Sequence, residues 1–268
     1  MTRLESPSSI NMYKQCPRKY YYAYIEKLPG KENIYTVRGW VVHKTLEEFF
    51  KTNPELLNEE NYEILLKVVI MNLFNSLWRE NLAKINQVLN HNVVIAEHYY
   101  YESMGMVNNW LNVFIARLKN EMGDKDVKDA FLALKPLTEQ KLVAESFNVQ
   151  GYIDAVYEKN EKVLIDYKTS RKNEISEEYK LQLGIYALLY RENKKSLPDK
   201  VGIMFLADGK ESFIDVDDSL IGLAESECRE MGERTKTGDK ADYCRKPGRL
   251  CKYASGEFDF YDVCRPFD

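Results

Sequence analysis

Apolar residues recur in the first half of the chain at intervals of three and four, the spacing of an amphipathic helix. The pair Ser6 and Pro7 predicts a helix start, and Pro17 marks the end of that helix or the beginning of a second one. Long segments with the same period follow at 59–90 and 101–122. The N-terminal half is therefore expected to be mostly helical.

The period changes near residue 137. Three short runs rich in β-branched residues are separated by turn-forming residues and predict an antiparallel meander. The runs are "EQKLVAESF", 149–157 and 162–168. Helical spacing returns in "SEEYKLQLGIYALLYRENKK", which begins with Ser176 as a capping residue. The stretch "KVGIMFLAD" predicts a further strand.

These patterns divide the chain into four parts: N-terminal helices at 1–50, a helical insertion at 51–135, a core of strands and helices at 136–238, and a tail at 239–268. The tail is rich in Cys, Lys, Arg, Gly and Pro and has too little periodic apolar content to pack unaided. With 268 residues, 44% of them hydrophobic, the chain can form one large domain that carries such an insertion.

The composition of the chain limits the classes of protein to which it can belong. No run of about eighteen apolar residues appears and the N-terminus lacks an apolar signal core, so a cytoplasmic protein is expected. The formal charge of −4 gives no overall signature of nucleic-acid binding, so contact with a polyanion has to come from local patches. Five cysteines are an odd number, which favours metal ligation over disulfides in a reducing compartment.

Two aspartates interrupt the apolar strands of the meander. If the turn between them centres on Asn160, Asp154 lies opposite Asp166 with Cβ atoms roughly 5 Å apart, and Lys168 shares that face. Two carboxylates so close repel each other unless a divalent cation lies between them, and oxygen ligands suit Mg²⁺ or Mn²⁺. Lys168 can then steady a metal-activated water or the charge on a phosphate. A register shift of one residue would separate the acids, and an exposed Asp–Lys ladder is the alternative.

The order of these motifs resembles the PD-(D/E)XK nuclease superfamily, and more specifically its RecB-like branch, which includes CRISPR-associated and AddB-type recombination nucleases. The motifs are "CPRKYYY", "GYID", "IDYKT", "QLGIY" and the tail cysteines, and the resemblance covers 6–50, 137–207 and 244–264. It implies an α/β fold with a restriction-endonuclease-like core of order α-β-β-β-α-β and a mixed central sheet. It does not explain the helical insertion.

The resemblance also implies roles for single residues. Asp154 and Asp166 would be metal ligands, His43 in "GWVVHKTLEEFF" a third, and Lys168 the catalytic lysine. The imidazole of His43 is compatible with Mn²⁺. From the residues alone, a polar residue at the edge of a helix is the favoured interpretation of His43.

Two further positions match the motif on the helix that follows the DYK strand. Gln182 and Tyr186 are four residues apart and would share a helix face that reaches the scissile phosphate or the lysine. A half-exposed helix flank is the alternative. Glu139 and Glu145 compete for the role of the upstream acidic residue.

The resemblance further implies that four of the cysteines hold a 4Fe-4S cluster, which would join the two ends of the chain. The tail departs from the compact spacing of the branch, with Ala254 where a cysteine is expected, so loss of the cluster, zinc in its place and scattered free cysteines remain alternatives. Cys228, in the helical "LAESECREM", is an ordinary thiol. The four implied ligands are Cys16, Cys244, Cys251 and Cys264.

Six cations flank these cysteines. Once the ends are joined they would form a patch beside the active site that contacts phosphates, while nearby tyrosines stack on unpaired bases. The helical insertion would cover the cleft and favour single strands or free ends. The six are Arg18, Lys19, Arg245, Lys246, Arg249 and Lys252.

The resulting expectation is a metal-dependent DNA nuclease that hydrolyses phosphodiester bonds by in-line attack of a metal-bound water. Its leading form is a single-stranded DNA exonuclease, working with CRISPR adaptation proteins on spacer precursors or with recombination and repair proteins. One rival is a catalytically silent iron–sulfur DNA-binding subunit of a larger complex, and another is a redox protein. The intact Asp154, Asp166 and Lys168 favour the nuclease, because a silent protein need not keep all three.

Overall fold

The chain folds into helices and strands that alternate as the sequence predicts. The computed structural model describes residues 3–123, 125–246 and 260–264. Its α-helices are α1 (Pro7–Gln15), α2 (Pro17–Tyr20), α3 (Ile34–Phe49), α4 (Tyr62–Glu80), α5 (Leu82–Val88), α6 (Val93–Met122), α7 (Val127–Leu134), α8 (Glu177–Lys194), α9 (Asp218–Arg234) and α11 (Tyr261–Cys264). Its strands are β1 (Leu137–Ala144), β2 (Val149–Tyr157), β3 (Val163–Lys168), β4 (Lys200–Phe205) and β5 (Lys210–Asp215).

The five strands form one mixed sheet in the order β1-β2-β3-β4-β5. The first three are antiparallel neighbours, which confirms the predicted meander. β4 runs parallel to β3 after the crossover helix α8, so the α/β class and the order α-β-β-β-α-β are confirmed. β5 was not predicted, because its sequence "KESFID" holds only two apolar residues and lies at the sheet edge, where Phe213 is 41% exposed.

The hairpin between β2 and β3 has the predicted register. Ala155 pairs with Ile165, so the turn centres on Asn160. The paired residues end there, and the same register continued by one residue would place Asp154 level with Asp166. The pairs Val156–Leu164 and Tyr157–Val163 have the same register, and a slip of one residue would move each side chain to the opposite face of the sheet.

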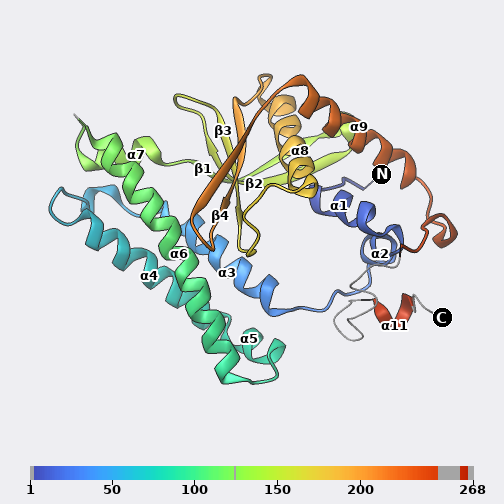
Figure 1. The fold of residues 1–268 in the computed structure, drawn as a ribbon, viewed down its shortest axis with the longest axis horizontal. Helices are drawn as coiled ribbons and strands as arrows, with labels where there is room; N and C mark the ends of the chain where they lie inside the picture. The colour runs from blue at the N-terminus through green and yellow to red at the C-terminus, as the bar shows by residue number, and fades with distance from the viewer. Residues whose placement is uncertain (1–2, 124, 247–259, 265–268) are drawn as a thin grey trace.

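Both faces of the sheet are covered by helices. One apolar cluster joins the sheet to α1, α8 and α9, and a second joins the other face to α3, α4, α6 and α7. Figure 1 shows α8 and α9 on one side of the sheet and the helices of the insertion on the other. Residues 51–135 contain helices α4 to α7, and these helices share their core with α3 and with Ile165 and Tyr167 of β3.

The longest helix, α6, begins earlier than predicted. Asn92 caps it by accepting a hydrogen bond from the Ile95 backbone N–H at 3.1 Å. Val93 and Val94 in its first turn are 72% and 77% exposed, and its buried positions begin only at Ala96. Because the first turn is exposed, the period of buried apolar residues does not reveal where the helix starts.

The start of the tail packs against the N-terminal helices, contrary to the expectation that it could not pack unaided. Tyr243 is fully buried, and its ring is stacked 6.1 Å from that of Tyr20. The Arg18 side chain donates from Nε to the Tyr243 carbonyl at 2.7 Å and from Nη2 to the Lys240 carbonyl at 3.1 Å. One tyrosine and one arginine thus anchor the segment around residues 240–243.

A search of the described helices for membrane spans finds none with the necessary length and apolar character.

Candidate active site

A histidine from α3 meets an aspartate from β2. His43 Nδ1 lies 3.1 Å from Asp154 Oδ1. The second oxygen of Asp154, Oδ2, accepts a hydrogen bond from the backbone N–H of Tyr167 on β3 at 2.6 Å. Asp154 is therefore held between the helix and the neighbouring strand.

The strands are distorted at this level. Residues two apart in a strand normally face the same side, yet Ile153 belongs to the apolar cluster under α8 and Ala155 to the cluster under α3. Opposite Asp154 on β1, Glu139 has a positive φ of 48°. Such a backbone conformation costs about 1–3 kcal/mol in a non-glycine residue. The break in alternation and the strained residue bring two carboxylates to the same place.

Three potential metal ligands come together here. Ligand atoms of His43, Glu139 and Asp154 all lie within 4.8 Å of one another, the one such group found in the described part of the chain. One imidazole nitrogen and two carboxylates fit a divalent cation such as Mn²⁺ or Mg²⁺. Of the two candidates for the upstream acid the structure favours Glu139, because Glu145 lies exposed in the turn after β1.

Electrostatics support a cation at this group. Burial and then the Asp154 carboxylate raise the pKa of Glu139. Carboxylates packed this closely repel each other unless a proton or a cation compensates their charge. The sequence left Glu139 and Glu145 as alternatives for the upstream acid, and the position of Glu139 opposite Asp154 in the meander is the signal that separates them.

Asp166 faces a lysine and does not belong to the group of three. It is buried, and Lys168 Nζ lies 2.7 Å from its Oδ2. Within residues 3–123, 125–246 and 260–264 that oxygen has no partner with hydrogen-bond geometry. The pKa of Asp166 is raised, chiefly by burial. The Lys168 ammonium lowers this pKa, and the Asp154 carboxylate raises it further. A buried oxygen that accepts no hydrogen bond can still act as a ligand to a cation.

Two residues of α8 complete the arrangement. Gln182 accepts a hydrogen bond from Lys168 Nζ at 2.9 Å through Oε1 and donates to Asp166 Oδ1 at 2.9 Å through Nε2. The Tyr186 hydroxyl also donates to Asp166 Oδ1, at 3.2 Å. The two residues share one face of α8, as predicted. Their contacts fix the orientation of the lysine and of the aspartate.

Metal binding should become tighter as pH rises. Burial alone lowers the pKa of His43, but the Asp154 carboxylate outweighs it and raises the pKa to about 9. The imidazole is therefore protonated at pH 7 and has to release a proton to bind a cation. We expect the apparent Mn²⁺ affinity to rise about tenfold per unit between pH 6 and 8.

Titration calorimetry at pH 6, 7 and 8 measures this dependence. His43→Gln should bind Mn²⁺ more weakly at pH 8 and lose most of the pH dependence. A wild-type affinity that does not change over this range would contradict His43 as a ligand.

Comparison with protein families gives one match, which spans nearly the whole chain. The family model of the PD-(D/E)XK nuclease superfamily matches residues 5–255. The chain belongs to this superfamily. Members of the superfamily use divalent metals, and the group formed by His43, Glu139 and Asp154 supplies a suitable acidic site in this chain.

Solved structures share the fold of this PD-(D/E)XK protein at low identity. A crystal structure from Eubacterium rectale, described as a "Putative exonuclease", has a TM-score of 0.51 and 12% identity, covering 95% of this chain and 93% of that chain. A protein named SSO0001 has a TM-score of 0.31 and 16% identity, covering 84% of this chain and 95% of that chain. The first likeness shows the fold alone, and the second is too weak to use. No curated protein matches the chain.

The segments that carry Cys244 and Cys264 of this PD-(D/E)XK protein both contact the N-terminal segment that follows Cys16. Cys16 and Cys264 are buried and Cys244 is exposed, while Cys251 lies outside the described residues. In the part of the chain that is described, the cysteines do not form a group of three ligand atoms. Cys228 is a buried thiol in α9 whose pKa is raised to about 12 by burial, consistent with an ordinary, unreactive cysteine.

The predicted basic patch is only partly described. Arg18 directs two donors at backbone carbonyls of the tail, so it has a structural role. Arg245 and Lys246 are exposed, Lys19 is half-buried, and Arg249 and Lys252 lie outside the described residues.

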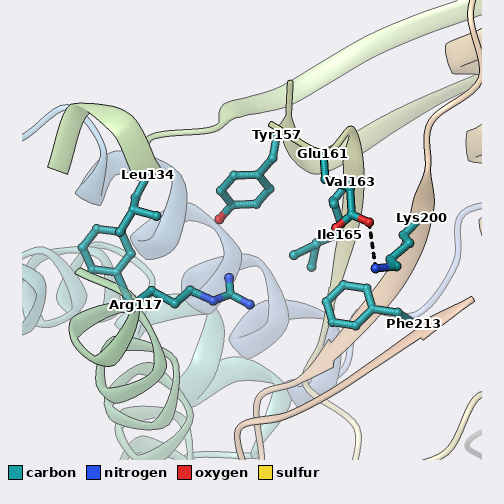
Figure 2. Close-up of a pocket in the computed structure, with 9 residues that line it drawn as sticks. Arg117, Leu134, Tyr157, Glu161, Val163, Ile165, Lys200 and Phe213 are labelled. Atoms are coloured by element: carbon teal, nitrogen blue, oxygen red, sulfur yellow. Dashed lines mark ion pairs between the residues drawn. The ribbon is translucent and has the colours of Figure 1, made fainter. Parts of the chain in front are cut away.

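A separate cavity of about 290 Å³ lies between α6, α7 and the sheet (Figure 2). Its lining includes Arg117, Tyr157 and Phe213, and Lys200 Nζ pairs with Glu161 Oε1 at 2.7 Å. None of the predicted site residues lines this cavity.

Proposed function

We propose that this chain is a metal-dependent DNA nuclease that hydrolyses phosphodiester bonds where α3, β1, β2 and β3 meet. The observation that carries the proposal is the group His43, Glu139 and Asp154, within 4.8 Å of one another, beside the ion pair of the buried Asp166 with the half-buried Lys168. A divalent cation held there would activate the attacking water and stabilise the charge on the phosphate.

Lys168 and the two residues of α8 beside it have separate roles in this proposal. Burial by itself lowers the pKa of Lys168, but Asp166 outweighs it and raises the pKa above its ordinary value. The lysine therefore stays protonated at neutral pH and acts as a donor to phosphate oxygen rather than as a general base. Gln182 holds its ammonium group, and Tyr186 steadies Asp166.

The preferred substrate in this proposal is single-stranded DNA with a free end, cut as an exonuclease would cut it. The description of the Eubacterium rectale structure as an exonuclease supports this form. The RecB-like resemblance of the motifs supports a setting in CRISPR adaptation or in recombination and repair, with proteins of those systems as partners.

Labelled DNA tests the function. Purified protein should cut single-stranded DNA with Mn²⁺ or Mg²⁺ and leave it intact with a chelator. Linear single strands should be cut faster than circular ones of the same sequence if the enzyme works from ends. Binding of DNA without any cutting would overturn the proposal in favour of a catalytically silent DNA-binding subunit.

We further propose a 4Fe-4S cluster on Cys16, Cys244, Cys251 and Cys264. Contacts between the chain ends support it: the Arg18 backbone N–H donates to the Cys244 carbonyl at 3.2 Å, and the Tyr22 hydroxyl to the Val263 carbonyl at 3.4 Å. These contacts bring the flanking segments of three of the cysteines together.

Visible absorption of protein purified without oxygen checks the cluster. The wild type should be coloured and Cys16→Ser largely colourless, whereas the buried control Cys228→Ser should keep the colour. A colourless wild type with one bound zinc per chain would instead identify a thiolate zinc site.

A further inference from the structure

A second pocket opens next to the proposed active site. Its volume is about 570 Å³, and it lies between α3, α6 and the segment that follows β3. Its lining includes Tyr35, Arg38, Tyr99, Glu102, Thr169 and Arg171. Figure 1 shows α3 beside α6 in this region. None of these side chains takes part in the proposed chemistry.

The pocket is within reach of a DNA strand bound at the active site. Thr169 follows Lys168 directly in the chain. Tyr35 precedes His43 by eight residues on α3, which is a helical rise of about 12 Å. Stacked nucleotides in one strand are about 3.4 Å apart. A base in the pocket would therefore belong to a nucleotide about three positions from the phosphate at His43.

A buried arginine forms the base of the pocket. Arg38 is 3% exposed, is paired with Glu102, and donates from Nη2 to the Thr169 carbonyl at 3.3 Å. Its Cζ lies 5.2 Å and 5.3 Å from the ring centroids of Tyr35 and Tyr99. Its Nε is buried and has no hydrogen-bond partner among the described residues. An unsatisfied buried donor is costly, and an acceptor on a bound ligand would satisfy it.

An aromatic ring is held in place at the pocket while staying open to solvent. Tyr35 is 60% exposed. Its ring lies edge-on to that of Tyr99, with centroids 5.8 Å apart, and their hydroxyl groups are 3.2 Å apart. An exposed ring whose position is fixed by neighbours suits stacking on a nucleobase at low entropic cost.

The charge of the pocket suits a nucleotide. Arg171 is exposed and pairs with Glu102 at 2.9 Å, so two arginines face one glutamate. The excess positive charge can pair with a phosphate next to the stacked base.

We propose that this pocket binds one unpaired base of the DNA substrate, stacked on Tyr35, with a neighbouring phosphate at Arg171. The inference rests on the proposed nuclease function and adds a subsite that positions the strand. A base inside a duplex is already stacked on both faces, so the subsite selects single-stranded DNA at this distance from the cut.

Binding measured in the presence of chelator tests the subsite without cleavage. Fluorescence anisotropy with a labelled single-stranded oligonucleotide should show about tenfold weaker binding for Tyr35→Ala than for wild type. Tyr35→Phe should bind as wild type, because it keeps the ring. Tyr101→Ala is the matched control: it removes a ring that is 56% exposed on α6 but does not line the pocket.

A scan with abasic oligonucleotides locates the bound base. One abasic position, about three nucleotides from the mapped cut, should weaken wild-type binding about tenfold and leave Tyr35→Ala unchanged. A flat scan, or equal affinities of Tyr35→Ala and Tyr101→Ala, would overturn the subsite even if the wild type cuts DNA. A wild type that binds as expected but cuts nothing would overturn the nuclease and leave the binding site standing.

Discussion

Asp154→Asn should lower the rate of DNA cleavage by about a thousandfold or more without unfolding the protein. The carboxylate touches both His43 and the Tyr167 backbone N–H, and it is one of the three grouped ligands. An asparagine can still accept the backbone hydrogen bond, so the strands should keep their positions. The neutral amide is a poor ligand for a hard cation, and a thousandfold loss corresponds to about 4 kcal/mol of transition-state stabilisation.

Single-turnover cleavage at several Mn²⁺ concentrations measures this effect, with thermal unfolding as the check on folding. Asp215→Asn is the matched control, because it removes an exposed carboxylate at the end of β5. A variant at Asp154 that keeps more than a tenth of the wild-type rate would exclude this aspartate as a metal ligand.

Lys168→Gln should lower kcat by about a hundredfold to a thousandfold while Mn²⁺ affinity changes little. The raised pKa keeps the ammonium charged, and the Gln182 amide oxygen and Asp166 hold it in a fixed direction. A fixed cationic donor contributes most where negative charge develops on the phosphate, which is in the transition state. Its loss should therefore appear in kcat more than in KM.

Steady-state kinetics at saturating Mn²⁺, together with calorimetry of Mn²⁺ binding, separate the two effects. Lys200→Gln serves as the control, since Lys200 also pairs with a carboxylate but lies at the cavity of Figure 2. If Lys168→Gln loses activity only because it no longer binds Mn²⁺, the ammonium has a role in assembling the site and not in the reaction.

Local patterns were sufficient to predict the part of the site that lies on the hairpin. The short turn centred on Asn160 determines which residues of β2 and β3 are level. Helical spacing likewise placed Gln182 and Tyr186 on one face. In both cases the contacts are between neighbouring elements, and their geometry follows from the period of the element.

Features that depend on strain or on distant contacts could not be predicted in the same way. In a regular strand, side chains alternate between the two faces of the sheet. The positive φ of Glu139 interrupts this alternation, so the direction of its carboxylate could not be predicted from its position in the strand. The pairing of Arg38 with Glu102 and the burial of Tyr243 arise between segments far apart in the chain. Periodicity describes one element at a time and contains no information on such partners.

The two ends of the helical insertion converge on the same small volume. His43 precedes residues 51–135 and Glu139 follows them, yet their ligand atoms lie within 4.8 Å of each other. An ion bound by both residues would thus close the long segment between them into a loop, as a covalent cross-link does. Because these helices pack against α3 and β3, which carry residues of the site, binding of the ion and packing of the helices should stabilise each other.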